Sequence, residues 1–403
     1  MKLFVLGAGA SKAYPNSFSG LRMPIARDFF KTFNKMKNLT ESSWVLVGPI
    51  INALQKLKGV ASYDPFKDEF DIEEIHSLIE KKLFESVHKK NFEDTLLFSQ
   101  AYSGLIFLFS TVVNDISNGP TSLPHENLVE IIDAEDVVIT FNWDTLLDRA
   151  LFESGKWCFE NGYFVKPRAI FNNGWQKLDS SKYNSKQPLL LKMHGSANWL
   201  TGYYTMNLQT HQFEFRHNME PDTFFVYQHS DKPYACYDGR WEKVYEPFSY
   251  GYYPPNLEEG YLKITEGHTG IILTPRSALH APKGSGDNSG LPSMPVIIPP
   301  VKYKTYEFFG NLFDQIWDKA GKSIQQADMI IFIGYSFPST DKKSKEIFIK
   351  SMMKRNNIPK INIIDPAPDR IKDFLIYEVG IPENMITIHK DYFSENFDLK
   401  KLI

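Results

Sequence analysis

Amide, imidazole and small side chains follow several apolar runs of this 403-residue chain. Asn142 comes after DVVITF, His194 comes after PLLLKM, and the segment GAGAS comes after KLFVL. The complete set is Gly7, Ala8, Gly9, Ala10, Ser11, Asn142, Asp144, His194, Gly334, Ser336 and Asp365. If the apolar runs are parallel strands, these residues meet beyond the carboxyl ends of the strands, where open sheets bind ligands. The pattern therefore predicts one site.

Asn142 and His194 are the candidates for catalysis. A neutral amide has a donor and an acceptor end, and an imidazole can take up a proton near neutral pH. Each residue also fits a structural role. His194 can be a buried histidine with satisfied nitrogens, Asn142 can be a turn residue, and Asp144 can be the N-cap of a helix.

The segment GAGAS is the candidate for binding a phosphate. Its two glycines let a ligand approach the backbone closely, and free N–H groups at such a turn can receive a pyrophosphate. The segment lacks the third glycine of G-x-G-x-x-G/A and the lysine–serine pair of a P-loop, so a tight strand-to-helix turn is the alternative. Ser336 also fits a helix start. Asp365 either ends a strand or binds the ribose hydroxyls of an adenosine, as in dinucleotide folds.

Short apolar runs predict the strands that position these residues. They span 2–6, 136–141, 188–193, 328–333, 360–364 and 385–389. Helical patterns follow at 144–152, 303–326, 340–354 and 369–377. Strands that alternate with helices predict an α/β fold with a Rossmann-like, doubly wound parallel sheet covered on both faces.

Two long segments interrupt this alternation and are predicted to be insertions. Residues 44–118 have apolar residues at helical spacing and predict an inserted helical module. Residues 199–295 predict an irregular, aromatic, β-containing insertion, in which GSGDNSG resembles a mobile loop. The Rossmann-like core is then built from residues 1–43, 119–198 and 296–403.

Composition excludes several classes of protein. The formal net charge of −3 gives no general electrostatic drive toward nucleic acid. The two cysteines, Cys158 and Cys236, build no disulfide framework, which predicts a reducing, cytoplasmic location. The chain has no uninterrupted run of about 18 apolar residues, and the run after Lys2 is shorter than the roughly 7–15 residues of a signal core. The histidines show no metal-ligand spacing, so no bound metal is expected.

Five of these segments together resemble sirtuins. GAGAS, TFNWD (Thr140 to Asp144), KMHGS, GYS and INIID follow the order of GAGIS, TQNID, HG, GTS and IN in that family. The resemblance covers the Rossmann-like core and leaves both insertions unmatched. It implies NAD+ as the substrate bound by this set of residues.

The departures from sirtuins point to a narrower group. Protein-deacylating sirtuins carry a zinc ribbon of two CxxC pairs between HG and GTS, whereas here that interval holds one cysteine, Cys236, so cysteines cannot build the zinc site. The sirtuin GIPDFRS segment is also missing. With DIEEI (Asp71 to Ile75) and IIPP (Ile297 to Pro300), the chain resembles the zinc-less, sirtuin-like NAD-cleaving proteins of bacterial anti-phage defence.

That resemblance implies an NAD+ glycohydrolase, which releases nicotinamide and ADP-ribose and depletes NAD+ on infection. Breaking the nicotinamide–ribose bond develops oxocarbenium character, and the leaving group is already cationic, so the site must hold the ribose, exclude bulk water and aim a nucleophile. Asn142 would then hold a ribose hydroxyl and a water, and His194 would take a proton from either. Asp144 would orient Asn142 or bind the nicotinamide amide.

Two alternatives remain open at this point. One is an NAD-dependent protein deacylase, and the other is a non-catalytic NAD- or ADP-ribose-binding subunit that regulates a partner ATPase. Because an unrestrained NADase would harm its host, we also expect a homo-oligomer whose activity rises when a partner protein or phage component binds, with GSGDNSG as a lid.

Overall fold

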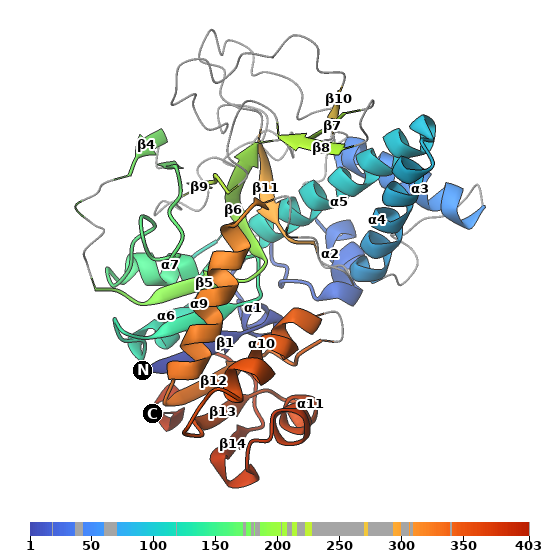
Figure 1. Cartoon of the computed structure of the whole chain (residues 1–403). Helices are drawn as coiled ribbons and strands as arrows, with labels where there is room; N and C mark the ends of the chain where they lie inside the picture. The colour runs from blue at the N-terminus through green and yellow to red at the C-terminus, as the bar shows by residue number, and fades with distance from the viewer. Residues whose placement is uncertain are drawn as a thin grey trace.

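The centre of the protein is a six-stranded parallel sheet (Figure 1). The computed structural model describes residues 1–17, 19–36, 43–59, 71–117, 119–171, 175–178, 181, 186–202, 204–207, 212–215, 222–227, 270–272, 293–299, 306, 309–338 and 341–402. The strand order is β14-β13-β12-β1-β2-β5. These strands are β1 (Lys2–Leu6), β2 (Val137–Thr140), β5 (Leu189–Lys192), β12 (Met329–Ile333), β13 (Lys360–Ile364) and β14 (Ile386–His389).

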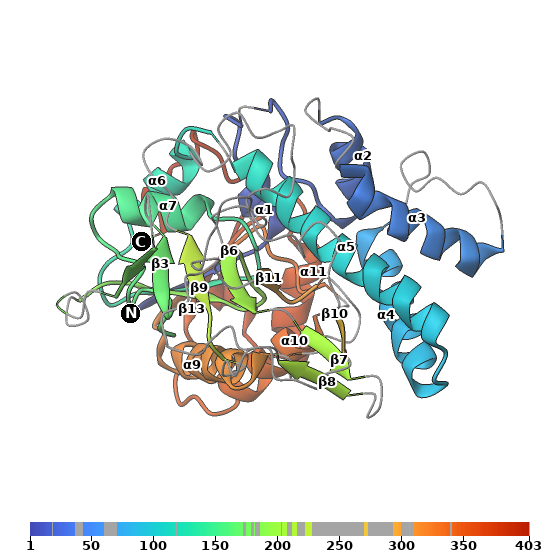
Figure 2. The same cartoon turned by 90° about the horizontal axis from the view of Figure 1, so that it is seen from above.

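The sheet is doubly wound, as the sequence predicts. From β1 the chain proceeds outward to β2 and β5, then returns to β12 on the other side of β1 and continues to β13 and β14. Helices α6 (Leu123–Glu130) and α7 (Leu146–Glu153) cover one face, and α9 (Leu312–Gln326) and α10 (Lys342–Met352) cover the other (Figures 1 and 2). The order of the strands therefore reverses between β1 and β12, which is the position where such sheets bind ligands.

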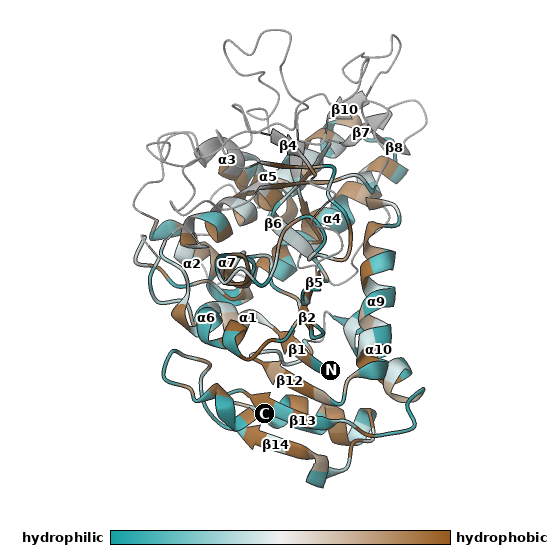
Figure 3. Cartoon of the chain, turned by 90° about the vertical axis from the view of Figure 1, so that its left-hand side faces the viewer, coloured by the Kyte–Doolittle hydropathy of each residue, from teal (hydrophilic) through white to brown (hydrophobic). Residues whose placement is uncertain are grey.

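The strand positions follow from burial on both faces of the sheet. Every residue of β2 is buried, and four of the five residues of β1, β12 and β13 are buried. Parallel strands covered by helices read as continuous apolar runs, which is why their positions are visible in the sequence. Helix α9 instead has one apolar side and one polar side (Figure 3), because only the side facing the sheet is buried.

The predicted helical module is present beside the sheet. Its helices are α3 (Ser43–Lys58), α4 (Ile72–His88) and α5 (Phe92–Ser117), and α5 packs against both α3 and α4. The short helix α2 (Phe29–Asn34) precedes the predicted bounds of the module. Asp71 caps α4, because its side chain accepts a hydrogen bond from the Glu73 amide at 2.8 Å. By length and composition alone, α5 could cross a membrane, but 75% of its apolar window is buried inside the fold. This packing accounts for its apolar composition.

The second insertion is β-containing, as predicted, in its described part. A five-stranded sheet has the order β11-β6-β9-β3-β4, and a three-stranded sheet has the order β10-β7-β8. These strands are β3 (Ala169–Phe171), β4 (Trp175–Lys177), β6 (Gly195–Gly202), β7 (Tyr204–Asn207), β8 (Gln212–Phe215), β9 (Phe225–Tyr227), β10 (Gly270–Ile272) and β11 (Ser293–Ile297). Strands β3 and β4 precede the predicted bounds of the insertion and join its sheet. The GSGDNSG loop and Cys236 lie outside the described residues. The domain boundaries remain a prediction.

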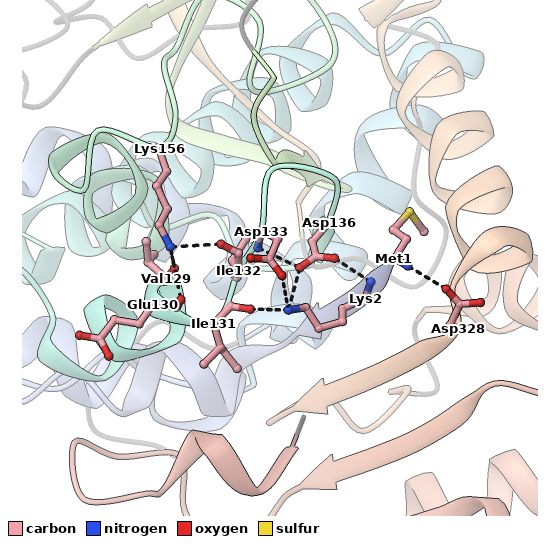
Figure 4. A network of polar contacts seen from close by, with 10 residues as sticks. All are labelled: Met1, Lys2, Val129, Glu130, Ile131, Ile132, Asp133, Asp136, Lys156 and Asp328. Atoms are coloured by element: carbon pink, nitrogen blue, oxygen red, sulfur yellow. Dashed lines mark hydrogen bonds and ion pairs between the residues drawn. The ribbon is translucent and has the colours of Figure 1, made fainter.

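At the amino ends of the strands, opposite the predicted site, polar contacts hold the segments together (Figure 4). Buried Asp136 accepts a hydrogen bond from the Lys2 amide at 2.7 Å and one from the Asp133 amide at 2.9 Å. The Lys2 ammonium lies 2.7 Å from a carboxylate oxygen of Asp133. Lys156 donates to the carbonyl oxygen of Val129 at 2.7 Å. These contacts fix β1 against β2 at the end remote from the predicted site.

Helices α4 and α5 enclose two ionisable side chains in an apolar layer. Burial lowers the pKa of His76 to about 3, and it raises the pKa of Glu80 to about 7 despite a hydrogen bond with Tyr102. A histidine with a lowered pKa favours folding less as the pH falls below its unfolded value of 6.5, whereas a glutamate with a raised pKa favours folding less as the pH rises above 4.5. Of these two side chains, Glu80 is the one whose ionisation lowers the unfolding free energy as the pH rises above 6.5.

We therefore predict that Glu80→Gln stabilises the protein at alkaline pH. Ionisation of Glu80 costs the wild type about 1 kcal/mol of unfolding free energy between roughly pH 6.5 and 8, since its folded pKa is about 7. The amide cannot ionise, so this decline should disappear. Urea unfolding of both proteins at these two pH values measures it, and parallel pH dependences would contradict the assignment.

Candidate active site

A cavity of about 510 Å³ lies at the carboxyl ends of the strands, at the point where the strand order reverses. Its lining includes most of the residues that the sequence singles out. They come from the ends of β1, β2, β5 and β12 and from helices beside them: Gly7, Ala8, Asn142, His194, Gly334 and Ser336, with Ile25, Ala26, Arg27, Asp71, Glu73, Phe141, Trp143, Tyr335, Pro338, Asp341 and Arg370. The structure thus brings together six of the predicted site residues.

The floor of the cavity is a close crossing of two backbone turns. The Gly9 amide donates to the Gly334 carbonyl at 3.1 Å, and Gly334 has a left-handed φ of +59°. A Cβ at Gly9 would lie 2.7 Å from the Gly334 Cα, and a Cβ at Gly334 would lie 2.5 Å from the Gly9 Cα. Only glycine fits on either side.

This crossing gives Gly9 a different role from the one expected. The Gly9 amide is bonded to Gly334, and the Ala10 amide donates to the Gly7 carbonyl at 2.9 Å. Neither amide is therefore free to receive a pyrophosphate, and neither residue lines the cavity. The glycines of GAGAS therefore let the turn after β1 pass in close contact with the turn after β12.

Asn142 is tied to the same turn. Its side-chain nitrogen donates to the Gly7 carbonyl at 2.8 Å, and only 9% of the residue is exposed. The backbone N–H of Asn142 also donates to the Thr140 hydroxyl oxygen at 3.1 Å. Among the described residues no group donates to its side-chain oxygen, so this acceptor end remains for a hydroxyl or a water.

His194 lies at the end of β5, where β6 begins, and is 2% exposed. Its Nε2 lies 3.2 Å from Oδ1 of Asp341, which is 3% exposed. Aromatic rings surround the imidazole, with the ring centres of Phe141 at 5.3 Å and Trp143 at 5.8 Å. Burial and the neighbouring Asp341 carboxylate raise the pKa of Tyr335 well above its ordinary value, so this phenol stays protonated.

Ser11 and Asp144 interact with each other. The Ser11 hydroxyl donates to Oδ2 of Asp144, and the Leu146 amide donates to Oδ1 at 3.0 Å. The Asp144 carboxylate therefore ties α1 (Ala8–Lys12) to the first turn of α7. It lies one layer behind the cavity, and within the described part of the chain no hydrogen bond from it orients the Asn142 side chain.

Behind the cavity, Lys192 is fully buried and joins the segments that carry the two candidate catalytic residues. Its ammonium donates to the Asp144 carbonyl at 2.5 Å, to the Ser196 hydroxyl at 2.9 Å and to Asp148 at 3.0 Å. Tyr163 donates to the second oxygen of Asp148 at 2.5 Å. One buried ion pair thus fixes the segment after β2 against the segment after β5.

A smaller pocket of about 110 Å³ adjoins the cavity and shares six lining residues with it: Ala8, Ile25, Ala26, Glu73, Asn142 and Trp143. Its other walls are mainly apolar and come from residues 23–29 and from the helical module. They include Phe29 of α2, Ile72 of α4, and Phe109 and Val113 of α5, together with Ser11 and Asp144. The indole of Trp143 lies edge-on to Phe109, with ring centres 4.8 Å apart. The helical module therefore completes the site.

Asp365 does not line the cavity. Its carboxylate accepts a hydrogen bond from the Ala367 amide at 2.8 Å, the local bond of an Asx turn. Arg370, on α11 (Asp369–Asp373), lines the cavity from the same region, and Arg27 lines it from the turn before α2. Neither arginine has an ion pair within the described parts of the chain. Sequence reasoning missed both, since an exposed arginine carries no signal without its surroundings.

Asp341 is the other residue that sequence reasoning missed. It precedes α10, where an aspartate reads as a helix cap, yet its side chain makes no capping bond. Its signal is the presence of an acidic residue shortly after β12, on the side of the sheet that carries the site.

No group of histidine, cysteine or carboxylate side chains suited to a metal occurs among the described residues. Cys236 lies outside them, so the absence of zinc stays a prediction.

No protein-family model matches the chain, and no curated protein matches it. Solved structures match at low identity. One on the mechanism and regulation of Sir2 enzymes is 14% identical and covers 96% of this chain and 86% of its own, with a TM-score of 0.35. A Sir2 homologue mutant in complex with ADP-ribose is 13% identical, with coverage of 91% and 80% and a TM-score of 0.30. One on sirtuin substrate affinity is 13% identical, with coverage of 100% and 90% and a TM-score of 0.30. Such values assign neither a family nor an activity.

We predict that Gly334→Ala is more destabilising than the same change at Gly155. Both glycines have left-handed φ angles, +59° and +71°, so each change costs about 1–2 kcal/mol in backbone strain. At Gly155 nothing lies within 4 Å of the new Cβ, whereas at Gly334 it meets the Gly9 backbone, which adds about 1–3 kcal/mol. Chemical unfolding of both variants tests this, and equal losses would show that the crossing tolerates a side chain.

Lys192→Met should lower the unfolding free energy by about 3–5 kcal/mol, because Asp148 would remain buried without its counter-charge. Adding Asp148→Asn to this variant should restore part of the loss, since the uncompensated charge is then removed. Chemical denaturation of the single and double variants measures both effects. A single variant as stable as the wild type would show that the ion pair is dispensable.

Proposed function

We propose that this protein is an NAD+ glycohydrolase that releases nicotinamide and ADP-ribose. The observation that carries the proposal is the cavity at the reversal of strand order, where Asn142 and His194 lie together, nearly buried, beyond the ends of adjacent strands. A dinucleotide is the ligand that binds at this position of a Rossmann-like sheet. Four of the five ordered sirtuin-like motifs, GAGAS, TFNWD, KMHGS and GYS, contribute residues to the same cavity.

The charges around the cavity suit both ends of NAD+. Arg27 and Arg370 offer guanidinium groups to a pyrophosphate, a role for which the Gly9 and Ala10 amides are already engaged. Asp341 and the acidic residues at the start of α4 face the same space. A carboxylate near the ribose stabilises the positive charge that develops as nicotinamide leaves.

The geometry supports a division of labour between the two candidate catalytic residues. The Asn142 amide is held by Gly7, so its oxygen can accept a hydrogen bond from a ribose hydroxyl or from the attacking water. His194 can take the proton that this hydroxyl or water gives up. The aromatic rings around His194 shield it from bulk water.

The adjoining apolar pocket is suited to the nicotinamide ring. It is lined by Trp143, Phe109 and Ile72, and it opens beside Asn142. A flat, cationic heterocycle packs favourably against aromatic faces. Asp144 lies on its wall and is placed to interact with the carboxamide.

Nicotinamide release from NAD+, followed with and without an acylated peptide, tests the proposal. We expect release in both cases and free ADP-ribose as the product. Release that depends on the peptide, with an acylated ADP-ribose as product, would instead indicate a protein deacylase. Binding of NAD+ with no turnover under any condition would indicate a regulatory binding subunit.

We predict that His194→Ala and Asn142→Ala each lower the rate of nicotinamide release by about 100- to 10,000-fold, because each removes a group at the reacting ribose. His88→Ala is the matched control, since this histidine is exposed at the end of α4. Thermal melts should show that all three variants are folded. A folded variant at position 194 or 142 with wild-type turnover would refute the role given to that residue.

We further propose that the enzyme acts in the cytoplasm as an NAD+-depleting effector of anti-phage defence, as a homo-oligomer controlled by a partner protein or phage component. The motif resemblance and the need to restrain such an activity support this. Light scattering together with activity at dilute concentration tests it, and a monomer with full constitutive activity would exclude the oligomeric control.

A further inference from the structure

The contact between His194 and Asp341 joins two elements that are far apart in the sequence. His194 lies between β5 and β6, and Asp341 lies before α10, on the other side of the reversal point. Nε2 of His194 and Oδ1 of Asp341 are 3.2 Å apart, an ion-pair distance at which their present orientation does not form a hydrogen bond, and the two side chains are 2% and 3% exposed. Burial of a carboxylate alone is costly in free energy, so the imidazole beside Asp341 lowers the cost of burying it.

Asp341 is held in place independently of His194. The Tyr335 hydroxyl lies 3.1 Å from Oδ2 of Asp341 and 2.7 Å from the Ser344 hydroxyl. The Ser344 hydroxyl donates to the Asp341 carbonyl at 2.7 Å, and the Asp341 amide donates to the Pro338 carbonyl at 2.9 Å. Oδ1 is therefore presented to the imidazole by a fixed carboxylate rather than by a mobile one.

Among the described residues, two tyrosines and a lysine lie near this pair. Tyr335 contacts Asp341 from the end of β12, and Tyr306 faces it from the segment before α9. The Lys343 ammonium of α10 lies over the Tyr306 ring at 4.1 Å and over the Trp317 ring at 4.9 Å. The rings of Phe141, Trp143 and Trp317 also lie around the imidazole.

We propose that Asp341 is the positioning residue of His194: after a small turn of the imidazole its carboxylate accepts a hydrogen bond from Nε2–H, so that the neutral ring carries its lone pair on Nδ1. A carboxylate can only accept a hydrogen bond, so it selects the tautomer with hydrogen on Nε2. During the reaction Nδ1 gains the proton that the ribose hydroxyl or water releases, Nε2 keeps its own, and the imidazolium is balanced by Asp341. This assignment rests on the proposed function for the step in which Nδ1 acts.

The first test needs no substrate. Nitrogen chemical shifts of ¹⁵N-histidine-labelled protein report the tautomer of each imidazole, and His194→Gln identifies the signals of His194. We expect the Nε2–H form in the wild type at pH 8, and a mixture of tautomers in Asp341→Asn and Asp341→Ala. An Nδ1–H form in the wild type, or an unchanged Nε2–H form in both variants, would overturn the proposal.

The second test is kinetic. In folded Asp341→Asn, kcat for nicotinamide release should fall by about 100-fold or more, as expected when an orienting carboxylate is lost, with KM changed by less than about 3-fold. Tyr335→Phe should give a smaller loss in the same direction. Asp136→Asn removes an equally buried carboxylate at the far edge of the sheet and should leave kcat unchanged once the protein is folded.

The outcomes separate this proposal from the proposed function. A raised KM with normal kcat in Asp341→Asn would make Asp341 a ligand of the substrate and would overturn the positioning role. If the wild type releases no nicotinamide, the glycohydrolase proposal fails, while the tautomer measurement still decides whether Asp341 sets the state of His194.

Discussion

The whole site depends on how closely two backbones pass each other at the centre of the sheet. β1 and β12 are neighbours from their first to their last residue, and their following turns cross with Gly9 against Gly334. Because no side chain fits between them, the two turns stay in contact as they leave the sheet. Asn142 then attaches to the first turn through the Gly7 carbonyl, and Tyr335 and Asp341 follow the second. A wider crossing would move the Asn142 side chain away from His194 and Asp341.

Around this crossing, three buried charged side chains join segments that are separate in the sequence. Asp144 joins α1 to α7, Lys192 joins the segments after β2 and β5, and Asp341 joins α10 to His194. Each uses a side chain that is nearly buried, so each depends on the others for the exclusion of water. The residues at the cavity wall are therefore placed by an interior of charged and hydrogen-bonded groups, rather than by packing alone.

The sequence predicts the sheet well and the site only in part, for physical reasons that differ. Strands such as β1 and β13 are buried on both faces, so they read as apolar runs bounded by glycine or aspartate. Asn142 and His194 are visible because they come directly after such runs. Asp341 is not, since its aspartate before a helix looks like a cap, and its contact with His194 exists only after the chain has folded. Asp365 was expected on an adenosine ribose, but its short side chain is taken up by the Ala367 amide.

The wall between the site and the helical module has a consequence for the thermodynamics of the protein. Phe109 of α5 packs on Trp143, and Asn114 of the same helix donates to the Ala197 carbonyl at 3.4 Å, three residues beyond His194. A ligand in the pocket beside Asn142 that binds differently when α5 shifts would be linked to α5, and by reciprocity a ligand that shifts α5 would change affinity at the pocket by the same factor. The helical module and the candidate site would then be two ends of one equilibrium.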